Sequence, residues 1–163
     1  MRIARSRRVA SGAAVIALLL ACAAAAAPSS DGDDQALLGD ADYMAGRSAL
    51  KAGNDANALR RFQSALKRFP EAADLHNELG FTHRRLRQMD KAFEHYWRAL
   101  DLNPQHRGAH EYIGEAYLIV GDVDRARFHL GALRSICLLG CDELKDLEKA
   151  IAEHLAGAAP PAR

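Results

Sequence analysis

The feature that most constrains this chain is an internal repeat of 34 residues. Three columns of like residues recur at that spacing: Gly46, Gly80 and Gly114; Ala58, Ala92 and Ala126; and the bulkier Phe62, Tyr96 and Leu130. Pro70 and Pro104 close the first two units. A fixed period of this length indicates a chain built from stacked copies of one small unit. We therefore expect three repeats, at residues 39–72, 73–106 and 107–140.

Each repeat is predicted to contain two helices. In the second repeat, apolar residues recur at helical spacing between Leu75 and Leu86, and again between Ala92 and Leu100. The polar turn "LRQMD" separates the two runs, and Pro104 cannot continue the second helix. The glycine and alanine columns let paired helices approach closely, while the bulkier column fills the space between them. The expected fold class is all-α.

Residues 75–104 resemble the tetratricopeptide repeat (TPR) family. Signature positions are occupied by Leu79, Gly80, Ala92, Tyr96, Ala99 and Pro104. The early tryptophan of the family is absent, and Asp42, His76 and His110 stand in its place. The resemblance implies a right-handed α-solenoid of three helix pairs that acts as a protein-binding scaffold and not as an enzyme. It names no cofactor.

After the third repeat, residues 141–157 are predicted to form a capping helix. One stripe of this segment is apolar and consists of Leu144, Leu147, Ile151 and Leu155. A repeat array needs such a helix to cover its last exposed layer. Residues 158–163 are expected to be a disordered tail.

The N-terminal 27 residues are typical of an export signal. Four arginines precede an apolar run from Gly12 to Ala27, which is short for a membrane span. Ala24 and Ala26 suit cleavage near residue 27, whereas "LLAC" resembles a bacterial lipobox that would place a lipid on Cys22. A retained anchor helix is a third alternative. Residues 28–38 are predicted to be a polar linker, and the expected location is the bacterial periplasm or a lipid anchor facing it.

The charge balance of the exported part argues against nucleic acid as a partner. Without the four leader arginines, the chain has 18 basic and 21 acidic residues. Such a mildly acidic, mixed surface lacks the basic patch that phosphate backbones require. We expect another exported or envelope protein as the partner, with the membrane contacted only through a lipid at Cys22.

The resemblance implies that the first helix of each repeat lines a concave groove. The residues expected to bind a partner segment there are Tyr43, Arg47, Asn77, Phe81, Arg84, Glu111 and Glu115. The carboxylate-clamp pattern of some relatives is absent, because Tyr43, Arg47, Glu78 and Gly108 occupy its columns. Phe81 is the expected anchor together with Tyr43. The alternative is that Phe81 only packs against the neighbouring repeat.

Other chemistry finds little support. His106 and His110 are four residues apart, but no third metal ligand lies near them in sequence. We find no nucleophile elbow, P-loop or metalloprotease motif.

Cys137 and Cys141 flank "LLG" and leave three interpretations open. An oxidising compartment and the turn-forming Gly140 favour a structural disulfide that joins the last repeat to the capping helix. Free redox thiols and half of a metal site are the alternatives, and either would make the chain a periplasmic redox or metal-handling accessory.

Overall fold

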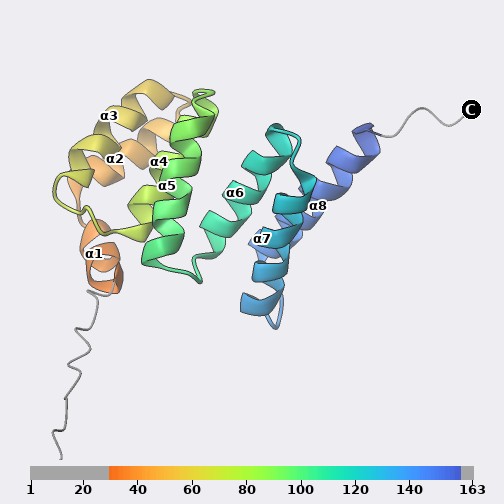
Figure 1. Ribbon diagram of the computed structural model, residues 1–163. Helices are drawn as coiled ribbons and strands as arrows, with labels where there is room; N and C mark the ends of the chain where they lie inside the picture. Colours follow the sequence, from red (N-terminus) through yellow and green to blue (C-terminus); the bar gives the residue numbers. More distant parts are fainter. Residues whose placement is uncertain (1–29, 159–163) are drawn as a thin grey trace, which may run out of the picture.

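The computed structural model describes residues 30–158, and this part of the chain forms eight helices and no strand. The helices are α1 (Ser30–Leu37), α2 (Ala41–Lys51), α3 (Asp55–Leu66), α4 (Ala73–Arg85), α5 (Met89–Leu102), α6 (Arg107–Ile119), α7 (Val123–Ile136) and α8 (Asp142–Ala158). They pair as α2 with α3, α4 with α5 and α6 with α7, and the pairs stack in chain order (Figure 1). The expected all-α repeat array is confirmed.

Short polar residues begin the helices where the sequence changes from turn to apolar period. The side chains of Asp40, Asn54 and Asp122 accept the backbone N–H three residues later, at 2.9, 3.1 and 3.0 Å. Each bond satisfies one of the donors that the first turn leaves open. His106 does the same for α6 through Nδ1, which accepts from Ala109 N at 3.1 Å.

The turn inside each repeat passes through a left-handed residue at the same place. Gly53 and Gly121 hold φ values of 74° and 80°, and Arg87 holds 60° in the second repeat. These three positions are 34 residues apart. Glycine adopts this region without a steric penalty, but an arginine there is strained. Arg87 is the one residue other than glycine with a positive φ among residues 30–158.

The glycine column sets how closely the helices approach. A Cβ added to Gly46 or Gly80 would lie 2.5 Å from the ring of Phe62 or Tyr96, respectively. The third repeat differs from the expectation, because a Cβ at Gly114 would meet Leu147 of α8 at 2.7 Å. The capping helix therefore supplies the side chain that we expected from Leu130.

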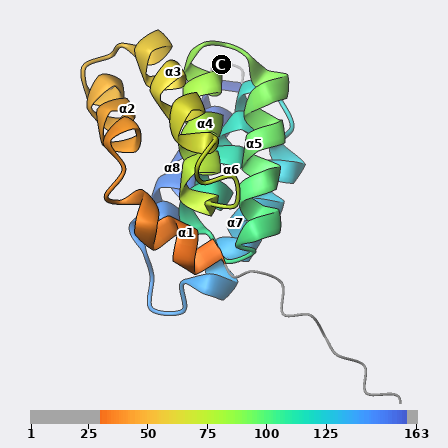
Figure 2. The ribbon, with the colours of Figure 1, turned by 90° about the vertical axis from the view of Figure 1, so that its left-hand side faces the viewer.

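The interior consists of two clusters of buried side chains. The first lies around α2, α3 and the start of α4 and includes Phe62, Leu75 and Leu79, all fully buried. The second extends from α5 to α8 and includes Tyr96 and Leu147. α8 contacts both α6 and α7, so its apolar stripe closes the C-terminal end of the array as predicted (Figure 2).

The prediction of a polar linker at residues 28–38 is wrong where the structure describes it. Ser30–Leu37 form α1, and Leu37 is fully buried in the first core cluster. The Asp34 carboxylate also accepts the backbone N–H of Asp74 at 2.9 Å. One apolar residue in a polar stretch thus seals the open N-terminal end of the array (Figure 2).

The leader at residues 1–27, with Cys22, and the tail beyond residue 158 lie outside the described part. α8 itself continues to Ala158, one residue into the predicted tail. Among α1–α8, none combines the length and hydrophobicity that a membrane span requires.

Histidines link successive repeats at the position where the family has tryptophan. The Nε2–H of His76 donates to the carbonyl of Pro70 at 3.1 Å, and its Nδ1 lies 3.0 Å from Nδ1 of His95. The same two distances recur 34 residues later between His110, Pro104 and His129. In the first repeat, the matching columns hold Asp42 and Arg61, which form an ion pair at 2.9 Å.

Cys137 and Cys141 form a disulfide at the junction of α7 and α8, as the structural interpretation predicts. Cys137 is packed into the second core cluster, while Gly140 takes a φ of 86°. The two residues that the bridge encloses, Leu138 and Leu139, are 85% and 103% exposed.

Candidate functional site

The structure separates the seven predicted groove residues into buried and accessible groups. Tyr43 is 3% exposed and packs on the ring of Phe62, with the centroids 5.9 Å apart. The prediction that Tyr43 offers an anchor to a partner is therefore wrong. Arg47 stands over the edge of this core, 5.8 Å from the Tyr43 ring centroid, and forms an ion pair with Glu78 at 3.6 Å.

Asn77 is also withdrawn from the surface. Its residue is 9% exposed, and a Cβ at Gly108 would lie 3.2 Å from its Nδ2. The Asn77 amide therefore packs against the start of α6. Its Oδ1 is buried without a hydrogen-bond partner among the described residues.

The other predicted residues meet in one cluster where α4 faces α6. The Arg84 side chain is only 11% exposed and pairs with the Glu115 carboxylate. Its guanidinium lies 5.3 Å from the Phe81 ring centroid and 5.4 Å from that of Tyr112. The two rings are 5.1 Å apart, so Phe81 does pack against the neighbouring repeat. Ring faces and a carboxylate together stabilise a cation that has lost most of its water.

Because these groups satisfy one another, Arg84 and Glu115 are held in place before any partner arrives. Their charges cancel, and neither is a free charge for a partner. Tyr112 belongs to this cluster and was not predicted. It lies in the column of Glu78, where only the absent clamp pattern drew attention to the sequence.

Glu111 is accessible but electrostatically unusual. Burial raises the pKa of its carboxyl from 4.5 to about 7, and the carboxylates of Glu115, Asp146 and Glu143 raise it further in the same direction. Arg84 opposes the shift. The raised pKa reports an acidic surface shared by α6 and α8.

Three adjoining hollows form one continuous groove across α4, α6 and α8. The first, about 640 Å³, is lined by Asp55, Phe81, Arg84, Arg85, Arg87 and Ile119. The second, about 390 Å³, shares Arg84 and Ile119 with the first and extends to α8. The third, about 230 Å³, shares Glu115, Ala150 and Glu153 with the second and includes Glu111. We call the first of these the α4 hollow and the whole the groove.

Ile119 and Arg87 are groove residues that the sequence interpretation missed. Ile119 is 51% exposed between two of the hollows. A signal was present for both, since Ile119 stands in a column that otherwise holds Lys51 and Arg85, and Arg87 stands in the column of Gly53 and Gly121. A residue that departs from its own repeat column has been placed there for a local reason.

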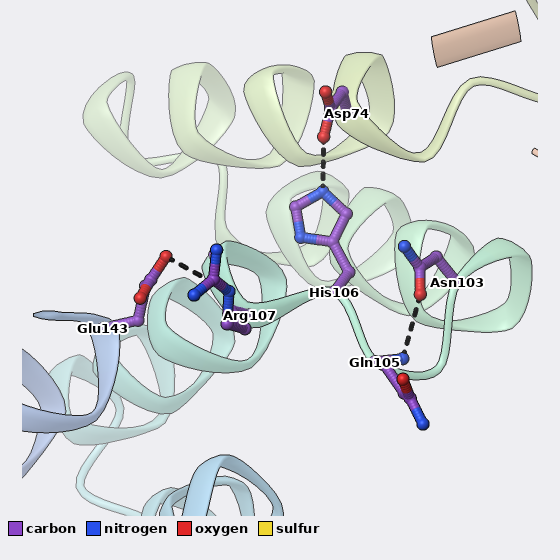
Figure 3. Close-up of a pocket in the computed structure, with 7 residues that line it drawn as sticks. Asp74, Asn103, Gln105, His106, Arg107 and Glu143 are labelled. Atoms are coloured by element: carbon purple, nitrogen blue, oxygen red, sulfur yellow. Dashed lines mark hydrogen bonds and ion pairs between the residues drawn. The ribbon is translucent and has the colours of Figure 1, made fainter. Parts of the chain in front are cut away.

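A separate hollow of about 350 Å³ lies where α5 meets α6, and its side chains are paired with one another (Figure 3). His106 uses Nδ1 to cap α6, so its Nε2–H donates to Asp74 at 2.9 Å. This bond lowers the pKa of the Asp74 carboxyl. Arg107 forms an ion pair with Glu143 at 3.7 Å. The arrangement joins the second repeat to the third and the third to the capping helix.

The metal interpretation gains no support from the described residues. His110 uses both ring nitrogens in the repeat link, and residues 30–158 contain no group of three His, Cys, Asp or Glu side chains placed to hold a metal ion.

Comparison with known proteins agrees with this architecture. Residues 43–106 match the family model described as Tetratricopeptide repeat. The chain carries tetratricopeptide repeats. Scaffolds of this kind are non-enzymatic binding modules, in agreement with the expectation from sequence. No curated protein matches the chain significantly.

Solved TPR structures share the fold at low identity. The TPR2B domain of yeast Sti1, in its complex with pHsp70, is 15% identical with a TM-score of 0.65, covering 77% of this chain and 98% of that one. The first TPR of Spaghetti (RPAP3), bound to the HSP90 peptide SRMEEVD, is 19% identical with a TM-score of 0.63, covering 76% and 95%. The Yersinia enterocolitica type III secretion translocator chaperone SycD is 17% identical with a TM-score of 0.62, covering 78% and 91%.

Proposed function

We propose that this TPR chain is an adaptor of the bacterial cell envelope that holds a segment of another exported protein in the groove. The observation that carries the proposal is the continuous groove from α4 to α8, which is wide enough for an extended segment and is lined by aromatic, apolar and charged side chains. Such a mixture suits recognition of a peptide better than of a small molecule.

Two similar structures support this function by analogy. Sti1 TPR2B and the first TPR of Spaghetti each carry a peptide or protein partner, as their descriptions state. Their identities to this chain are below 20%, so the support concerns the scaffold and not the partner. The absent clamp pattern argues against the same mode of binding here, because Glu78 and Gly108 place no cation or amide where a terminal carboxylate would sit.

The envelope location rests on the leader. The arginines and apolar run of residues 1–27 would direct export, and Cys22 would receive a lipid if the "LLAC" sequence is processed as a lipobox. Radiolabelled palmitate incorporated by the wild type and lost in Cys22→Ser would establish the anchor. Cleavage near residue 27 without label would establish a periplasmic protein, and a full-length cytosolic chain would contradict the proposed location.

The groove is best tested with a photocrosslinking amino acid at two adjacent positions in the native cell. Ile119 and Val120 are 51% and 52% exposed, but only Ile119 lines the groove. We expect one defined protein to crosslink from position 119 and not from position 120. Identical crosslinking patterns from the two positions would contradict a role for the groove.

A further inference from the structure

The α4 hollow has an apolar floor with cations at its rim. Phe81 and the half-exposed Ile119 face the same space, which Arg84, Arg85 and Arg87 border. A volume of about 640 Å³ is ample for a large aliphatic or aromatic side chain and the backbone that carries it. Exposed apolar side chains in a charged surround mark a contact that is made only when a partner covers them.

The three arginines of this hollow are not equivalent. Arg84 is neutralised by Glu115, and Arg85 forms an ion pair with Asp55 at 2.9 Å. Arg87 is exposed, and its guanidinium has no ion pair within residues 30–158. The hollow therefore offers one unpaired cation next to its apolar floor.

Arg87 is also held where its own fold would favour glycine. The matching residues in the other repeats are Gly53 and Gly121, and Arg87 keeps a φ of 60° at the cost of strain. Packing does not explain the arginine, because its side chain is exposed. Strained residues persist where they serve a task outside folding, and binding a carboxylate is the task that a free guanidinium performs best.

The opposite end of the groove has the opposite charge. Glu111, Glu115, Asp146 and Glu153 line the third hollow, with Lys149 as its single cation. Only Arg84 reaches this acidic group from the other side, and it is already paired. A uniformly acidic segment would be repelled there, and a uniformly basic one would be repelled at Arg87.

We propose that the groove binds a segment of bipolar charge, in which a large apolar residue occupies the α4 hollow, a carboxylate beside it pairs with Arg87, and a basic residue lies further along, toward α6 and α8. The inference deepens the proposed function and rests on it. It also gives the segment a direction, because reversing the order of its charges would place each one against its like.

The probe for this inference is a phage-displayed library of random 12-residue peptides, panned on the exported chain. We expect enriched peptides to carry an acidic residue next to a bulky apolar one, with Lys or Arg several residues away on one consistent side. Enriched peptides without this order would overturn the inference and leave the proposed function standing. A library that yields no peptide competing at the groove would count against both.

Variants of the chain then locate the contact with the best enriched peptide. Arg87→Gly should weaken binding by about three- to fivefold, the range of an exposed ion pair, and make it less sensitive to salt. The same variant should raise the melting temperature, because glycine relieves the strain. Arg87→Lys keeps the charge and should keep most of the affinity.

The apolar floor has its own matched pair. Ile119→Ser should lower affinity by about tenfold through the loss of apolar contact, whereas Val120→Ser should leave it unchanged. Unchanged affinity in Arg87→Gly and Ile119→Ser, with both variants folded, would overturn the inference even if peptides of bipolar charge had been enriched.

Discussion

At the scale of single residues, the tightest constraint comes from pairs 19 residues apart. His76 with His95, His110 with His129, and Asp42 with Arg61 connect the two helices of each repeat through equivalent positions. The Pro70 carbonyl only accepts, so the neutral His76 must carry its proton on Nε2 and present a bare Nδ1. His95 must then donate from its own Nδ1. The same reasoning fixes His110 and His129.

These pairs predict a specific loss of stability in acid. Burial lowers the pKa of His95 and of His129 from 6.5 to about 4, with the neighbouring histidines adding to the shift. The folded state therefore binds protons less readily than the unfolded state, and the free energy of unfolding should fall as the pH drops from about 6.5 to about 4. Allowing for partial solvent access, the loss is about 2 kcal/mol for the two together.

Urea unfolding at pH 7.5, 5.5 and 4.5 would measure this loss. His95→Gln with His129→Gln should flatten the dependence, while the partly exposed His154→Gln should not change it. The measurement is cleanest in a Glu111→Gln background, because Glu111 titrates with the opposite sign in an overlapping window. An equal slope in the double histidine variant would refute this origin.

A second residue-scale prediction concerns the glycine column. Gly80→Ala places a Cβ 2.5 Å from the Tyr96 ring, and the ring is too buried to move aside without cost. We expect a loss of about 2 kcal/mol in the free energy of unfolding. Gly131→Ala is the matched control in α7, because nothing lies within 4 Å of its added Cβ and the helix favours alanine by about 1 kcal/mol. Thermal unfolding of the two variants should therefore shift in opposite directions.

At the scale of elements, the two ends of the array are closed in different ways. At the N-terminal end, the short α1 contributes little apart from Leu37, which fills the first core cluster. At the C-terminal end, α8 places Leu147 against Gly114 and is joined to α7 by the disulfide. Arg134 of α7 and Glu148 of α8 add an exposed ion pair at 2.9 Å. A long helix tethered at its first turn can thus serve as a lid over an otherwise open layer.

The disulfide should matter mostly for this helix. A closed loop of five residues restricts the unfolded chain by about 2 kcal/mol, so Cys137→Ser with Cys141→Ser should be destabilised by that amount. Hydrogen exchange should accelerate in α8 more than in α2–α5. A reducing agent should reproduce the effect in the wild type and leave the double variant unaffected. Uniform acceleration across all helices would mean that the bridge does not act on the cap.

At the scale of the whole molecule, the groove separates charge along its length. The Arg84–Glu115 pair divides an end with an unpaired arginine from an end where carboxylates crowd one another. Stability is reduced where like charges remain close and half-buried. A binding surface that is strained at Arg87 and self-repelling at Glu111 is what a partner of complementary charge would relieve.

This crowding gives a whole-molecule prediction. The pKa of Glu111 rises from 4.5 to about 7, so the folded state binds more protons than the unfolded state between these values, and the free energy of unfolding falls as the pH rises through them. Glu111→Gln removes that fall. At pH 8 the variant should be more stable than the wild type by about 1 kcal/mol, after allowance for solvent.

Chemical unfolding at pH 8 would measure the gain, with Glu94→Gln, an exposed change on α5, as the control that should be neutral. The difference between Glu111→Gln and the wild type should shrink toward pH 5. A destabilised Glu111→Gln at pH 8 would contradict the inferred crowding.

The sequence alone determined the repeat architecture, because a 34-residue period in glycine, alanine and aromatic positions is a local pattern that each unit repeats. It also determined the cap, from the stripe that includes Leu147, and the cysteine pair as a joint between α7 and α8. These features depend on contacts within a unit or between sequence neighbours, and periodicity encodes such contacts directly.

Only the tertiary structure decided which residues remain open to a partner. Tyr43 and Asn77 lie in groove-facing columns but are buried by Phe62 and by the start of α6. Arg84 and Glu115 neutralise each other, while Ile119 and Arg87 stay available. Column position gives the direction in which a side chain leaves its helix, but exposure and free charge depend on what the next repeat places opposite it. That requires the packed array.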